Sequence, residues 1–130
     1  MNDDNFPDIE VYLLTNSVED ILVWLAGCFE SMSPAKKAGN TLKLSGSIQK
    51  NTIPITITRQ AAGKHFTSIT FDSNKTTWAT DLDCARSAFA NLGVEVRCSA
   101  DSWTESSEYS IESHWWRITE QGESRLSWQD

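Results

Sequence analysis

Residues 41–58, TLKLSGSIQKNTIPITIT, contain the clearest structural pattern in the chain. Leucine and isoleucine alternate with lysine, serine and threonine on both sides of the short polar segment 49–51. Because successive side chains of a strand point to opposite faces of a sheet, this alternation predicts two strands with one buried and one wet face. We expect the two strands to form an antiparallel hairpin.

Two residues of this hairpin predict local features. Gly46 interrupts the first strand and is a candidate position for a β-bulge. Pro54 lies inside the second strand, and proline has no N–H to donate to a neighbouring strand. The second strand is therefore expected at or near an edge of the sheet.

An amphipathic helix is expected before the hairpin, after a β-prone segment at residues 8–14. Asn16 and Glu19 form a capping box, in which Asn16 is the expected N-cap. Ser33 and Pro34 are expected to end the helix. Its apolar stripe follows helical spacing and contains Val18, Ile21, Leu22, Leu25, Cys28, Phe29 and Met32.

After the hairpin, the pattern predicts a strand over 66–71 and a second helix. Thr80 is the expected N-cap of this helix and Gly93 its C-terminal stop. Alternation then predicts a strand over 94–98, a Ser- and acid-rich loop from 101 and a terminal hairpin formed by 115–120 and 125–128.

The predicted order, β-α-β-β-β-α-β-β-β, indicates an α+β fold in one domain, residues 1–130. We expect a two-layer sandwich of a mostly antiparallel sheet, with about six to seven strands and two helices on one face. This order resembles a ferredoxin-like plait with extra strands. The alternative is a pair of βαβββ modules, 8–60 and 64–130, that share a curved sheet.

Length and composition favour a soluble, cytoplasmic protein. The chain has 130 residues, and no apolar run approaches the roughly 20 residues that a membrane-spanning helix needs. The first ten residues, MNDDNFPDIE, are acidic where a signal peptide is basic and then apolar. No membrane association is expected.

Charge is distributed unevenly along the chain. The net charge is −7, yet residues 36–75 carry seven basic residues and one acid. The overall charge argues against nucleic-acid binding. The basic segment could hold a small anion through Lys43, Lys50, Arg59 and Lys64, or these side chains could simply be solvated.

The tryptophans suggest a binding surface. Trp115 and Trp116 are adjacent in a predicted strand, so their rings point to opposite faces and one should lie outside the core. Tryptophan is enriched among residues that dominate binding energy. Trp103 and Tyr109 could join the outward ring, or the loop 101–113 could fold over it.

Evidence for catalysis is weak in this sequence. The chain-local candidates are Cys98 with His114, oriented by Asp101 or Glu112, and Cys84, whose thiol could be activated by a helix N-terminus. The chain has two histidines and no CxxC, HExxH, GxxxxGK[ST] or GxGxxG motif. We therefore expect no metal and no cofactor.

The favoured hypothesis is a small acidic, non-catalytic module for protein–protein interaction, such as a regulator or an inhibitor of a basic protein. Its partner would be another protein or a second copy in a homodimer. The first alternative is a binder of a small anion through segment 36–75, and the second is a thiol- or histidine-dependent enzyme.

Overall fold

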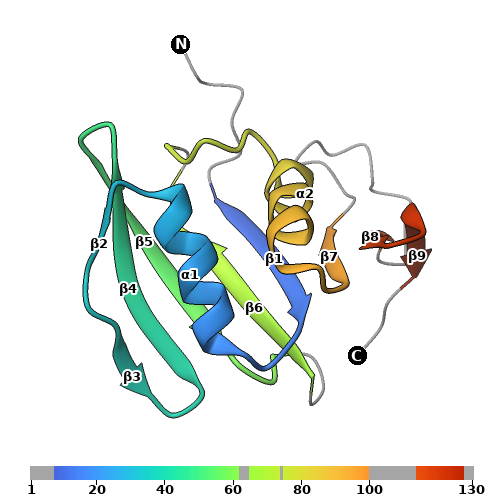
Figure 1. Ribbon diagram of the computed structural model, residues 1–130, viewed down its shortest axis with the longest axis horizontal. Helices are drawn as coiled ribbons and strands as arrows, with labels where there is room; N and C mark the ends of the chain where they lie inside the picture. Colours follow the sequence, from blue (N-terminus) through green and yellow to red (C-terminus); the bar gives the residue numbers. More distant parts are fainter. Residues whose placement is uncertain (1–7, 62–64, 74, 100–113, 128–130) are drawn as a thin grey trace.

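The alternating segments form the strands of one antiparallel sheet in the computed structural model, which describes residues 8–61, 65–73, 75–99 and 114–127. The described part contains two helices and nine strands (Figure 1). In chain order they are β1 (Ile9–Leu14), α1 (Val18–Cys28), β2 (Ser31–Met32), β3 (Lys36–Ala38), β4 (Thr41–Ile48), β5 (Asn51–Thr58), β6 (Phe66–Phe71), α2 (Asp81–Leu92), β7 (Val96–Ser99), β8 (His114–Thr119) and β9 (Gly122–Ser127).

The predicted α+β class and mostly antiparallel sheet are confirmed, but the strand count of six to seven is wrong. The two additional strands, β2 and β3, are short and both pair with β4. They lie in a segment that we expected to be the end of the first helix and the connection after it. Strands of two and three residues are too short to show an alternating pattern.

The sheet order is β2-β4-β5-β6-β1-β7-β8-β9, and every neighbouring pair is antiparallel. The first strand, β1, lies between β6 and β7. The ranges 8–60 and 64–130 therefore interleave in one sheet.

Both helices lie over the same face of the sheet (Figure 1). The apolar side chains of the strands point to this face and form one core with the two helices. Val11 of β1 pairs with Ile69 of β6, which pairs with Ile57 of β5, so one row of buried side chains crosses three strands. The opposite face carries the polar residues of the same strands. We call it the open face, meaning only that neither helix covers it.

The first helix ends earlier than expected. It stops at Cys28, and Phe29 is already extended. The next residues pair with β4 instead, because Glu30 N–H donates to the Ser47 carbonyl (2.8 Å) and Ser33 N–H to the Ser45 carbonyl (2.8 Å). The helical spacing of Phe29 and Met32 did not reveal this change, since both side chains still reach the core from extended backbone.

Gly46 is not a bulge. It pairs regularly with Met32 of β2 and Ile53 of β5. The Phe29 ring packs directly on it, and a Cβ at this position would lie 2.6 Å from the ring. The glycine is therefore explained by close packing of an aromatic ring on the backbone.

Pro54 does not mark an edge strand, because β5 lies inside the sheet between β4 and β6. The Asp72 N–H donates to the Pro54 carbonyl (3.0 Å), and in antiparallel strands the N and O of one residue face the same neighbour. The proline nitrogen thus faces the side where β6 has ended at Phe71. Only one bond at the end of the ladder is lost.

Candidate functional site

Trp115 and Trp116 lie on opposite faces of β8, as the sequence predicts. Trp116 pairs with the buried Cys98 of β7 and packs against the core, and the Arg125 guanidinium lies 5.3 Å from its ring centre. Trp115 pairs with Ser99 and points to the open face. The tryptophan outside the helix-covered core is therefore Trp115.

Four side chains gather around this position from four neighbouring strands. Tyr12 of β1 meets Trp115 edge to face, with ring centres 5.5 Å apart. Arg97 of β7 pairs with Tyr12 in the sheet, and its guanidinium lies 4.9 Å from the ring centre of Phe66 on β6. We call Tyr12, Phe66, Arg97 and Trp115 the aromatic cluster.

Charged groups frame the aromatic cluster. Arg97 forms an ion pair with Glu95 at 2.7 Å, and both side chains are largely sheltered, at 16% and 19% exposure. The Tyr12 hydroxyl donates to Glu10 Oε2 over 3.5 Å. Burial raises the pKa of Glu10, and the hydrogen bond from Tyr12 partly opposes this rise. The cluster is thus a set of half-buried aromatic rings on neighbouring strands, and its arginine is paired with Glu95.

Sequence reasoning found only Trp115 of this cluster. Trp103 and Tyr109, which we expected beside it, lie outside the described residues. Tyr12, Phe66 and Arg97 do occupy outward positions of alternating strands, but nothing local shows that β6, β1, β7 and β8 are neighbours. That information comes from the sheet order alone.

The structure does not bring the described candidates for anion binding, Lys43, Lys50 and Arg59, into one site. Lys43 lies on β4 opposite Lys36 of β3, and both are exposed. Lys50 is in the turn at the other end of β4, roughly 20 Å away along the strand. Arg59 follows β5 at the end nearer Lys43 and is half-buried, and Lys64 lies outside the described residues. A small anion cannot contact both Lys43 and Lys50.

The thiols are not arranged as activated nucleophiles. Cys84 and Cys98 are buried and Cys28 is half-buried. Burial raises the pKa of Cys98 to about 12 and that of Cys84 well above its usual range, which opposes the expected effect of the α2 N-terminus on Cys84. Asp101, Glu112 and the side chain of His114 lie outside the described part of the chain.

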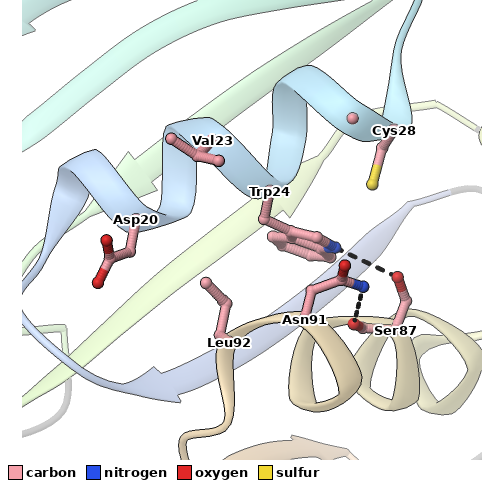
Figure 2. A pocket seen from close by; sticks show the side chains of 8 residues that line it. Asp20, Val23, Trp24, Cys28, Ser87, Asn91 and Leu92 are labelled. Atoms are coloured by element: carbon pink, nitrogen blue, oxygen red, sulfur yellow. Dashed lines mark hydrogen bonds between the residues drawn. The ribbon is translucent and has the colours of Figure 1, made fainter.

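A groove of about 590 Å³ opens between the two helices (Figure 2). Trp24 of α1 donates its indole N–H to Ser87 Oγ of α2 at 3.2 Å, and Asn91 Nδ2 donates to the Ser87 carbonyl at 2.8 Å. The polar groups of Trp24, Ser87 and Asn91 in the groove are therefore hydrogen-bonded to one another. Its lining consists of Asp20, Val23, Trp24, Gly27, Cys28, Ser87, Asn91 and Leu92.

Comparisons with protein-family models, with curated proteins and with solved structures give no match to this chain. Within the described ranges, no three His, Cys, Asp or Glu side chains are grouped so that they could hold a metal ion. Among the residues that the structure describes, no helix has the length and apolar character needed to cross a membrane.

Proposed function

We propose that this protein is a non-catalytic interaction module that binds another protein through its open face, with Trp115 and Tyr12 as the anchoring residues. The observation that supports this most is the edge-to-face Tyr12–Trp115 pair, whose strand positions alternate with the buried, helix-facing ones. Tryptophan, tyrosine and arginine are the residues most enriched where interface energy concentrates.

Preorganisation supports the same proposal. The four residues of the aromatic cluster come from strand positions, and Arg97 is held by both Glu95 and the Phe66 ring. Ordering flexible side chains costs about 0.5–1.5 kcal/mol each on association. A cluster that is already ordered avoids much of this cost.

Charge favours a partner different from this chain. Two copies with a net charge of −7 repel one another, whereas a basic protein is attracted at long range. We therefore propose a basic protein as the partner and a regulatory or inhibitory role for the complex.

The test compares the two adjacent tryptophans. Trp115→Ser should abolish binding of the partner captured on the tagged protein from its own cell extract, while the melting temperature stays within a few degrees. Trp116→Ser should lower the melting temperature strongly, because it opens a cavity against the core. Binding is measured by calorimetry with the purified partner, and folding by circular dichroism.

Two results would contradict the proposal. Unchanged partner affinity in Trp115→Ser would remove the open face from the interface. A strong loss of stability in both variants would make Trp115 a packing residue. If light scattering instead shows a dimer that Trp115→Ser separates, the occupant of the face is a second copy and the basic partner is wrong.

We also infer that the fold is related to the ferredoxin-like plait. Its support is the antiparallel order β5-β6-β1-β7 combined with α1 following β1 and α2 connecting β6 to β7. In this interpretation the sheet has additional strands at both edges, namely β2, β3, β4, β8 and β9.

The cysteines support a cytoplasmic location for the protein. All three are free, and two of them lie in the core.

A further inference from the structure

The groove between α1 and α2 is lined by polar and apolar side chains, and its apolar part has no cover among the described residues. Val23 of α1 lines it and is 73% exposed, the highest value of any large hydrophobic side chain in the described part of the chain. Leu92 and the half-buried Cys28 continue the apolar surface (Figure 2). A concave surface that combines apolar side chains with a few polar groups is typical of a binding site.

Gly27 leaves space beside the backbone of α1. A Cβ at this position would have no atom within 4 Å. Glycine within a helix costs about 1 kcal/mol relative to alanine, and no contact in the described structure requires its small size. The missing side chain widens the groove next to Val23, where another chain could approach α1 closely.

The charge at the groove is acidic. Asp20 is its only charged lining residue, and Glu19 is exposed beside it on the same helix. These two acids are the only charged residues of α1, which has no lysine or arginine. The nearest described arginine on α2, Arg86, is bound to Glu123 at 2.8 Å. A ligand of opposite charge is therefore favoured, and a second copy would bring the same acids.

We propose that this groove docks a basic amphipathic helix of a partner protein. Apolar side chains of that helix would cover Val23 and fill the space at Gly27, and a lysine or arginine would reach Asp20. The length of α1, 11 residues or about 16 Å, matches three turns of a docked helix. The site lies on the helix side of the sheet, so the inference does not rest on binding at the aromatic cluster.

Cys28 provides a direct readout because it lines the groove, whereas Cys84 and Cys98 are buried in the core. The probe is a synthetic 14-residue helix of leucine and lysine with apolar residues at helical spacing. At saturation it should slow alkylation of Cys28 by iodoacetamide at least fivefold, measured by mass spectrometry. Two control peptides should leave the rate of Cys28 alkylation unchanged. One has the same composition without the helical spacing, and the other has glutamate in place of lysine.

Variants locate the peptide. Gly27→Leu adds a side chain at a position where the Cβ meets no atom within 4 Å, and it should weaken peptide binding at least tenfold. The matched exposed substitution Ala26→Leu lies outside the lining and should leave the affinity for the peptide unchanged. Asp20→Asn should weaken binding and reduce its dependence on salt.

Undiminished Cys28 alkylation with the leucine–lysine helix would overturn the proposal, as would equal affinity in Gly27→Leu and Ala26→Leu. Trp115→Ser should bind this peptide normally. Loss of peptide binding in Trp115→Ser would place the peptide at the open face and overturn the groove assignment. If the peptide does not bind in the groove, the proposal that a protein binds at the open face is unaffected, because the Trp115→Ser and Trp116→Ser comparison tests it separately.

Discussion

Asp81 is a residue whose ionisation is linked to the fold. It begins α2, and its Oδ1 accepts the Glu10 N–H of β1 at 3.2 Å, beyond the short β1–β7 pairing at Tyr12 and Leu13. Burial raises its pKa from 3.8 to about 7, and the carboxylates of Asp8 and Glu10 add to the rise. The Asp81 carboxyl thus accepts the hydrogen bond from Glu10 N–H at a position of β1 where β7 provides no carbonyl.

The pH dependence follows from this shift. Between pH 3.8 and about 7 the folded state holds a proton on Asp81 that the unfolded chain has lost, so stability falls as pH rises through this window and stays lower above it. Asp81→Asn keeps the Oδ1 acceptor and removes the ionisation. We expect it to raise the free energy of unfolding by about 1 kcal/mol at pH 8.

Urea denaturation of the parent protein and of Asp81→Asn, each at pH 4 and pH 8, measures the difference in their free energies of unfolding. The expected gain in stability is small because water reaches part of the carboxyl and because a negative charge in the first turn of a helix is favourable. If Asp81→Asn and the parent protein have the same free energy of unfolding at both pH values, the carboxyl acts only as a hydrogen-bond acceptor and its ionisation is not linked to folding.

At the scale of elements, the two helix N-termini differ in how well the sequence predicted them. Thr80 caps α2 as expected, accepting the Asp83 N–H at 3.2 Å, and Gly93 ends the helix in the left-handed conformation. The expected cap of α1, Asn16, is wrong by one residue. Ser17 is the N-cap, and its Oγ accepts the Asp20 N–H at 3.3 Å.

Ser17→Ala should therefore lower the free energy of unfolding by about 1 kcal/mol, since a helix N–H loses its acceptor. Asn16→Ala, at the exposed neighbouring position, should change it by less than about 0.5 kcal/mol. Chemical denaturation of the two variants beside the parent protein provides the measurement. A larger effect at Asn16 would restore the capping box that the sequence suggested.

The strands show the same division between local and distant information. Alternation placed Ile53, Ile55 and Ile57 correctly in the core. It did not place β5 in the interior of the sheet, because Pro54 was interpreted without knowing where β6 ends. A lone proline indicates an edge only if its nitrogen faces a neighbouring strand, and the register decides that.

At the scale of the whole molecule, one core contains two of the three cysteines. Cys84 comes from α2 and Cys98 from β7, and both side chains are fully buried. Reaching either thiol requires the helix layer to separate from the sheet. Their reactivity therefore reports global unfolding, whereas Cys28 reports the groove.

We expect iodoacetamide at pH 8 to modify Cys28 in the native protein and to modify Cys84 and Cys98 at least a hundredfold more slowly. In denaturant all three should react at similar rates, because the raised pKa values of the buried thiols are lost on unfolding. Peptide mapping by mass spectrometry distinguishes the sites. Rapid native alkylation of Cys84 or Cys98 would instead support the thiol-dependent enzyme.

The sequence by itself determined which side chains of β4 and β5 face the core, where α2 begins and ends, and that Trp115 and Trp116 face opposite ways. These features depend on the period of a strand or helix and on side chains within one turn, so they are local. The tertiary structure alone decided the strand order, the short strands β2 and β3, and the meeting of Tyr12, Phe66 and Arg97 with Trp115. Pairing between distant strands depends on how whole apolar faces fit together, and no single segment carries that information.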